Sequence, residues 1–540
     1  MKNYQSIQTE EVPPSEPVFA ATQINSSNSN NNNNIKNAHP QDHLAPPFDS
    51  PERPSNLFVG TFNLIATIVG GGVLSLPIVF EKCGIAFTTL GMILSAAMTY
   101  ATLVMLCYCG RRGGGSSYGE VVRSAFGTRM EEGVSWLLFV FLWFVIVAYM
   151  ILIRDIWTPL VRQVGGWSDA DGNYVLLGIT VILLPLLFQR SLHALRYNCY
   201  IGSASIFVLC IALCRGGWQN LHNNDDHDDD DNDGDYYDNI SDIIEEEDND
   251  FTIEYFKMPS LQDALFSFPI LSLCFLCHFN IISIQNALHE PTRQRIQNLT
   301  KYAILASFLL MYSFGLGGYL YARSSTEGNI LLNVPTVREP GEDEAEYYLF
   351  LLGRIGCGTT IVFAWPLMLL PCRESLLEVV DVWFHHTHPR DSTTEDEIFE
   401  VPAEGSPFEE DDANNDDNVC SPHIKPSVLL RHDPIQSDYI FRNALLHYGS
   451  TMFVIITCYL AAVAVTGVAV VWSFAGSSMA FFIAFILPCG CFVVIESAVP
   501  TAEEGGDRKG GWIWLARGMF CLSAVGAVVC TVNNTMSLWR

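Results

Sequence analysis

The chain has 540 residues, of which 49% are hydrophobic and 16% are charged, and its mean hydropathy is +0.23. Soluble proteins usually carry roughly 25% charged residues, so this composition indicates a membrane protein. The formal net charge of −29 arises mainly from three tracts without Lys or Arg, residues 225–254, 339–346 and 391–417. Because nucleic-acid binding needs a basic surface and the remainder is only slightly basic, no nucleic-acid partner is expected.

The N-terminal segment, residues 1–55, is polar, with several prolines and an Asn run at 30–34. Such a composition cannot bury a hydrophobic core. The segment also lacks the basic n-region and short apolar h-region of a cleaved signal peptide. We therefore predict a disordered cytosolic tail, with the first apolar helix acting as the signal for membrane insertion.

Apolar stretches recur from residue 57 onward, and about 20 helical residues are needed to cross ~30 Å of hydrocarbon. We predict a membrane domain at 56–533 with eleven spanning helices, followed by a short tail at 534–540. The predicted spans are 57–80, 85–108, 134–157, 173–188, 199–214, 265–286, 302–322, 349–371, 446–471, 477–498 and 512–533. The predicted fold class is an all-α, multi-pass integral membrane protein.

The distribution of Lys and Arg sets the predicted orientation, because cytoplasmic loops are enriched in these residues. With a cytosolic N-terminus, the inside loops carry 16 of them and the outside loops and C-terminus carry eight. The acidic insert at 218–258 then faces the lumen or exterior, where the sequon at Asn239 is a candidate for glycosylation. The acidic insert at 385–440 faces the cytosol and is a candidate for phosphorylation or for docking a partner.

The first span, "NLIATIVGGGVLSLPIVF" (63–80), carries three consecutive glycines, Gly70, Gly71 and Gly72. Each glycine costs about 1 kcal/mol relative to alanine inside a helix. A helix that breaks at membrane depth must line a cavity or be buried in protein, and transporters use such breaks to bind substrate with main-chain groups. Close helix packing is the alternative, but it needs small residues one turn apart. We therefore predict a substrate site here, with Thr67 beside it.

The sixth span, "FSFPILSLCFLCHFNIISIQNAL" (266–288), is interrupted by Pro269 and by the polar residues His278, Asn280 and Ser283. A broken helix in one half of a transporter predicts a counterpart in the other half. The spacing of five spans therefore predicts a five-plus-five inverted repeat with one extra helix, in which helices 1 and 6 are broken.

Two ionisable residues within the predicted spans have alternative interpretations. His278 changes charge near neutral pH and is a candidate for proton coupling, or it is a neutral histidine bonded to a neighbouring helix. Asp155 follows Arg154 at the outer end of the third span, so it forms a surface ion pair or solvates the helix end, or it carries protons. The sequence leaves both choices open.

Six stretches in order resemble one known family. The first span has Asn63 followed by "TIVGGGVLSLP", and the next stretches are "GGGSSYGEVVRSAFG" (113–127) and "AYMILIRDIWTPLV" (148–161). Three more are "LRYNCYIGSASIFV" (195–208), "SFPILSLCFLCHFNIISIQNALHEP" (267–291) and "RIGCGTTIVFAWPLMLLPCRESL" (354–376). Together they resemble the amino acid/auxin permease family, within the amino acid–polyamine–organocation superfamily.

This resemblance implies symport of small, mostly neutral amino acids on the inverted-repeat transporter fold. The α-carboxylate would meet the amides of Gly70 to Gly72. The α-amino group would meet carbonyls around Leu273, Cys274 and Phe275. Tyr149 and Phe275 are the implied aromatic walls, and the family implies no cofactor and no metal.

The coupling ion is predicted from departures from the family pattern. Sodium-coupled members place an Asn where this chain has Ala66 and a Thr near Ala364, and Na⁺ prefers oxygen ligands that alanine lacks. Thr67, Thr359 and Thr360 lie close enough to compensate. We favour proton coupling over sodium coupling, with Asn63, His278, Asn280, Thr359, Thr360 and Asp155 as candidate coupling or gating residues.

Other functional classes find less support in the sequence. No nucleophile motif of the Gly-x-Ser-x-Gly type and no His-Glu-x-x-His motif is present, so an enzyme is not expected. A nutrient sensor on the same fold is an open alternative, because it would bind an amino acid and signal with little flux. The predicted location is a vacuolar or lysosomal membrane, or the plasma membrane.

Overall fold

A computed structural model describes residues 55–113, 117–164, 171–189, 198–225, 256–336, 344–387, 444–465, 467–498 and 506–538. The N-terminal tail at 1–54 and most of both acidic inserts, with the sequon at Asn239, lie outside the described residues. Within the described part every regular element is a helix, as the composition predicts. The structure therefore belongs to the all-α class.

The long elements are α-helices. They are α1 (Leu57–Ile68), α2 (Leu76–Gly113), α3 (Tyr118–Phe126), α4 (Thr128–Val164), α5 (Gly172–Leu187), α6 (Asn198–Asp225), α7 (Leu261–Cys274), α8 (His278–Ala287), α9 (Arg293–Ala322), α10 (Glu344–Thr387), α12 (Ala444–Ala464), α13 (Val468–Ala475), α14 (Leu487–Ser497) and α15 (Gly506–Leu538). Short 3₁₀ turns are η1 (Gly71–Ser75), η4 (Arg323–Ser325) and η5 (Ile330–Leu332). Two π-helical turns, η6 (Gly476–Ala480) and η7 (Phe482–Ile486), join α13 to α14.

Nine helices of the described part are long and apolar enough to cross a membrane, whereas the sequence predicts eleven spans. The difference comes from the first and fourth predicted spans. There the apolar helices α1 and α5 have only 12 and 16 residues. α1 stops at Ile68 because the glycine run follows it, and the rest of the predicted first span joins the second across a kink.

This kink lies at Gly84, whose φ of 72° and ψ of 168° suit glycine and almost no other residue. Thr88 Oγ1 donates to Val79 O over 3.1 Å, although residues nine apart in a straight helix are separated by about 13 Å. The chain therefore bends sharply at Gly84 inside α2.

The boundaries near the C-terminus also differ from the predicted ones. The predicted spans 446–471 and 477–498 are found as α12, which ends at Ala464, and a helical run from Val468 to Ser497. Gly467, in an extended conformation, caps α13. Because the flanking residues are apolar on both sides, hydropathy does not reveal this break. α15 continues to Leu538, into the predicted tail.

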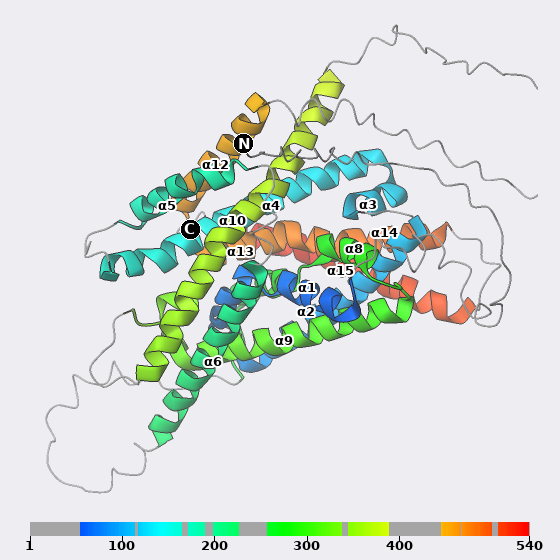
Figure 1. The fold of residues 1–540 in the computed structure, drawn as a ribbon. Helices are drawn as coiled ribbons and strands as arrows, with labels where there is room; N and C mark the ends of the chain where they lie inside the picture. The colour runs from blue at the N-terminus through cyan, green and yellow to red at the C-terminus, as the bar shows by residue number, and fades with distance from the viewer. Residues whose placement is uncertain are drawn as a thin grey trace, which may run out of the picture. The chain divides into compact units, whose positions relative to one another are not determined.

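The helices pack so that α10 lies along α4 and α6, while α9 lies along α2 and α6 (Figure 1). At one end of the bundle, Ser55 pairs with the end of α8: its N–H donates to Ala287 O over 3.0 Å, and His289 N donates to Ser55 O over 2.7 Å. At the other end, Ser75 Oγ donates to Gly328 O over 2.6 Å. The segment from Ser55 to Ser75 is thus bonded at both ends.

Candidate functional site

The first helix unwinds where the glycine run predicts. Val69 leaves helical geometry with φ −81° and ψ 83°, and Gly70 is extended with φ −121° and ψ −162°. Gly70 O accepts from Val73 N over 3.2 Å, which begins η1. The Gly70 amide donates to Ile68 O over 3.0 Å. The first N–H groups of a helix have no partner within that helix, so the amides of Gly71 and Gly72 are the ones available to a ligand.

The second break separates α7 from α8. Leu273 O accepts from Leu276 N over 3.0 Å, and α8 starts at His278. The last carbonyls of α7 have no partner within the helix. Cys274 Sγ lies 3.8 Å from Gly72 O, so this carbonyl end of α7 is adjacent to the amide end of η1.

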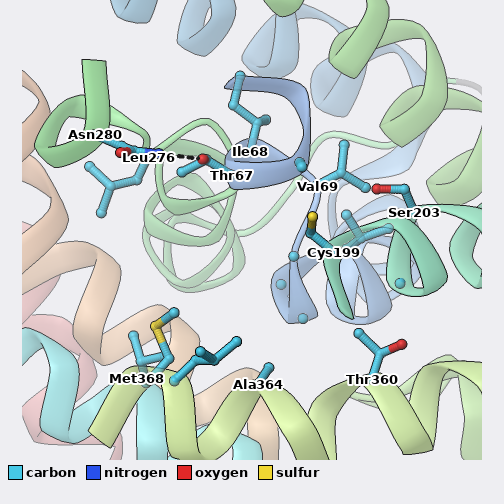
Figure 2. Close-up of a pocket in the computed structure, with 18 of the residues that line it drawn as sticks. Thr67, Ile68, Val69, Cys199, Ser203, Leu276, Asn280, Thr360, Ala364 and Met368 are labelled. Atoms are coloured by element: carbon cyan, nitrogen blue, oxygen red, sulfur yellow. Dashed lines mark hydrogen bonds between the residues drawn. The ribbon is translucent and has the colours of Figure 1, made fainter. Parts of the chain in front are cut away.

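A cavity of about 930 Å³ lies between the two breaks. Residues of α1, η1, α4, α6, α7, α8, α10 and α13 line it, and none of those described is Asp, Glu, Lys, Arg or His. Thr360, Ala364 and Met368 of α10 lie across the cavity from Thr67 and Ile68 at the end of α1 (Figure 2). The cavity extends to Ser55 and Ala287, at the end of the bundle opposite the Ser75–Gly328 hydrogen bond.

Gly70 and Gly71 face different surroundings. A Cβ atom added at Gly70 would have no atom within 4 Å. One added at Gly71 would lie 3.2 Å from Tyr149 Cε1 and from Leu152 Cδ1, both on α4. Gly70 therefore borders open space, and Gly71 is held tightly against α4.

A hydrogen bond connects the two broken helices across the cavity wall. Asn280 Nδ2 of α8 donates to Thr67 Oγ1 of α1 over 2.9 Å, shown as a dashed line in Figure 2. Thr67 Oγ1 in turn donates to Asn63 O over 2.8 Å. The side chains of Asn280 and Thr67 are thus used to fix α8 to α1.

A double-mutant cycle measures this bond. Thr67→Val and Asn280→Ala are each expected to lower the stability of the purified protein by about 1 kcal/mol, the usual net value of one hydrogen bond. The double variant is expected to melt no lower than the more damaging single variant, because both changes remove the same interaction. Melting temperatures of the four proteins in detergent test this, and additive losses would contradict it.

Ten of the predicted site residues line the cavity. They are Asn63, Thr67, Gly70, Gly71, Gly72, Tyr149, Leu273, Cys274, Asn280 and Thr360. Four do not: Asp155, Phe275, His278 and Thr359. Asn239 lies outside the described residues. Most of the predicted site residues therefore lie on the cavity wall, and the exceptions depend on where single side chains point.

Phe275 is not the aromatic wall that was expected. Its side chain is fully buried in the hydrophobic core, and Leu276 lines the cavity instead. The chain leaves α7 at this residue, so the helical face that carries Leu273 and Cys274 ends there.

His278 also lies away from the cavity wall. Its Nε2 is 2.8 Å from Thr102 Oγ1 of α2, and its ring meets that of Phe485 edge-on with the centroids 6.4 Å apart. It is fully buried, and Nδ1 has no hydrogen-bond partner among the described residues. The alternative of a histidine bonded to a neighbouring helix is the one observed.

Asp155 and Thr359 lie outside the cavity on α4 and α10. Asp155 Oδ1 is 3.5 Å from Arg154 Nε, and the Arg154 guanidinium donates to Ala462 O over 2.9 Å. The ion-pair alternative for Asp155 is therefore observed. The hydroxyl of Thr360, the neighbour of Thr359, lines the cavity and donates to Gly356 O over 2.8 Å.

The sequence analysis missed lining residues on α6, α4 and α13. Asn198, Cys199 and Ser203 of α6 belong to the stretch 195–208 quoted above, but the sequence did not indicate that their side chains face the cavity. Trp472 was missed because it falls between two predicted spans, whereas in the structure it lies within α13. Within the part of the chain that is described, no cluster of three His, Cys, Asp or Glu side chains could hold a metal ion.

The chain matches known transporters over most of its length. Residues 53–495 match the family described as transmembrane amino acid transporter protein. "Vacuolar amino acid transporter 6" of Saccharomyces cerevisiae is 23% identical over 79% of this chain and 88% of that protein. "Vacuolar amino acid transporter 5" of Schizosaccharomyces pombe is 26% identical over 60% of this chain and 70% of that protein.

A third relative is the "Putative sodium-coupled neutral amino acid transporter 11" of Mus musculus, which is 22% identical over 60% of this chain and 65% of that protein. All three names describe transporters and none describes an enzyme. With the family match across residues 53–495 and nine apolar helices in the described part, the chain belongs to the family of transmembrane amino acid transporter proteins, which are integral membrane proteins.

Proposed function

We propose that this protein is a secondary active transporter that moves small neutral amino acids by alternating access. The observation that carries the proposal is the meeting of two helix breaks at one cavity, whose described lining residues carry no charge. Main-chain amides stand on one side of it and main-chain carbonyls on the other. This arrangement is complementary to a zwitterion, which has one negative and one positive group.

The substrate would be held by its main-chain groups. The α-carboxylate binds the amides of Gly71 and Gly72, because the expected third donor, the Gly70 amide, already donates to Ile68 O over 3.0 Å. The α-ammonium binds carbonyls at the end of α7, at Leu273 and Cys274. Tyr149 covers one side. In support, Gly70 borders open space and Gly72 O lies 3.8 Å from Cys274 Sγ.

The absence of charge on the described lining residues supports a neutral side chain on the substrate. A cationic or anionic side chain would lose its hydration without gaining a partner, and an unpaired charge in the membrane interior costs several kcal/mol. The names of the relatives, vacuolar and neutral amino acid transporters, agree with this class.

The proposed topology has eleven helices in a five-plus-five inverted repeat plus one, with a cytosolic N-terminus. In this orientation the end of the cavity at Ser55 and Ala287 opens to the cytosol. At the opposite end Ser75 of η1 is hydrogen-bonded to Gly328 O, which supports the proposal that this is an inward-facing state. Asn239 and the insert at 218–258 are then lumenal, and the insert at 385–440 is cytosolic and can dock a partner. Two relatives named as vacuolar support a vacuolar membrane.

Proton coupling is proposed in preference to sodium coupling. Ala66 and Ala364 line the cavity and offer no side-chain oxygen. Thr67 Oγ1 already accepts a hydrogen bond from Asn280 Nδ2 over 2.9 Å, so one of its oxygen lone pairs is in use. A hard cation prefers a set of free oxygen ligands, which favours the proton.

The test is uptake of labelled amino acids into proteoliposomes. We expect neutral amino acids to be accumulated when the outside is acidic, with about a tenfold gain in accumulation per pH unit of gradient if one proton moves with each substrate. Replacing sodium by choline should change nothing, and a protonophore should abolish accumulation. Accumulation that follows the sodium gradient would refute proton coupling. Binding without flux would identify a sensor.

A further inference from the structure

A tryptophan outside the two broken helices reaches the proposed substrate site. Trp472 lies on α13, lines the cavity, and is 4% exposed. Its Cζ2 is 3.7 Å from a Cβ atom added at Gly71. In an indole ring Cζ2 and Nε1 are bonded to the same carbon, so the edge of the ring that carries the N–H group lies beside the start of η1.

The N–H group of this indole lacks an acceptor. Nε1 is buried and has no hydrogen-bond partner among the described residues. Buried polar groups in native proteins are nearly always paired, and an unpaired donor costs free energy. Nε1 itself exposes less than 1 Å², so a ligand would supply the acceptor after a small rotation of the indole ring toward the cavity that this side chain lines.

The position of Trp472 is fixed by bonds on both sides of its helix. The next residue, Ser473, donates through Oγ to Phe266 O of α7 over 2.7 Å. Asn534 Nδ2 of α15 donates to Ser473 Oγ over 2.8 Å. α13 is therefore held between α7 and α15, and the indole edge is held against Gly71 without contributing to those bonds.

We propose that Trp472 Nε1–H donates a hydrogen bond to the α-carboxylate of the substrate, as an additional donor beside the amides of η1. This proposal rests on the proposed function. Hydrogen bonds to a carboxylate are roughly twice as strong as those to a neutral acceptor. Trp472 would therefore favour a free carboxylate over an amide, and thus free amino acids over derivatives blocked at the carboxyl group.

The experiment compares two probes on the reconstituted full-length protein. They are the neutral L-amino acid transported fastest in the uptake panel and the primary α-amide of the same amino acid, the latter measured as a competitor. For Trp472→Phe, which removes the N–H group and keeps an aromatic ring, we expect the KM of the amino acid to rise about tenfold. The inhibition constant of the amide should rise no more than about twofold.

Trp365→Phe is the matched control. Trp365 of α10 is fully buried, and its Nε1 also has no hydrogen-bond partner in the described part of the chain, but the residue does not line the cavity. This variant is expected to leave the preference for the carboxylate over the amide unchanged. If both variants change the two constants alike, or if Trp472→Phe keeps the wild-type preference, Trp472 only packs and the proposal is wrong.

A second substitution and the wild-type uptake panel separate the possible outcomes. If Trp472→Phe does not give a monodisperse protein, position 472 can instead carry 3-benzothienylalanine, which has the shape of tryptophan and sulfur in place of the N–H group. The same loss of preference is expected. If the wild-type protein neither binds nor moves any amino acid of the panel, the proposed function fails. If the wild-type protein transports amino acids but the variants at position 472 keep the wild-type preference for the carboxylate over the amide, only this inference fails.

Discussion

Replacing Gly71 with Leu is expected to abolish amino acid uptake. A Cβ atom at this position would already lie 3.2 Å from Tyr149 Cε1 and Leu152 Cδ1, so the rest of a leucine side chain has no space. It would push Tyr149 away and cover the start of η1. Overpacking and the loss of one charge-assisted hydrogen bond together amount to about 3 kcal/mol, or roughly a 100-fold fall in kcat/KM.

The control for this variant is Gly178→Leu on α5. Gly178 is exposed, and a Cβ atom there would meet nothing within 4 Å, so uptake should stay at the wild-type level. Gly70→Ala gives a milder test, because its methyl group would enter open cavity without touching the protein. It should weaken uptake while leaving the melting temperature unchanged. Full activity of Gly71→Leu would show that the glycine run is not part of the substrate site.

Replacing Gly476 with Ala is expected to destabilise the folded protein. Gly476 begins the first π-helical turn and faces the main chain of α7. A Cβ atom there would lie 2.7 Å from Pro269 C and 3.0 Å from Pro269 Cβ. Main-chain atoms cannot move aside as a flexible side chain can, so α13 and α7 must separate. We expect the free energy of unfolding to fall by about 1–3 kcal/mol, the range typically seen for overpacked cores.

The measurement is the melting temperature of the purified protein, with Gly449→Ala of α12 as the control. A Cβ atom at Gly449 would have nothing within 4 Å. Alanine is about 1 kcal/mol better than glycine inside a helix, so this control should melt at or slightly above the wild-type temperature. Equal melting temperatures for the two variants would show that α13 and α7 are less closely packed than the structure indicates.

The sequence was most informative where local chemistry decides the structure. Three adjacent glycines cannot continue a helix cheaply, so the break at Gly70 is predictable from residues 63–80 alone. At the second break the predicted segment is right: the break directly precedes His278, the first of the predicted polar interruptions, whereas Pro269 does not end the helix. Pro269 lies inside α7, and the helix ends several residues later at Cys274, where no glycine or proline stands. Contacts with neighbouring elements, which single-sequence reasoning does not see, decide that end.

The orientation of single side chains was the least predictable feature. For His278 the sequence left open a coupling role and a bond to a neighbouring helix, and in the structure its Nε2 lies 2.8 Å from Thr102 Oγ1 of α2. Trp472 was missed because uninterrupted apolar residues hide the start of α13 at Val468. In both cases the outcome depends on packing between helices far apart in the chain, which hydropathy does not encode.

The bonds at Ser55 have a mechanical consequence. Two main-chain hydrogen bonds fasten the start of α1 to the end of α8, and the Asn280–Thr67 bond fastens the same two helices nearer the middle of the bundle. With both ends attached, α1 and α8 are expected to swing as one rigid pair. The hinges of that pair are then the two unwound segments, at Val69 and Gly70 and at residues 275–277, so a single motion would widen or narrow the passage at Ala287.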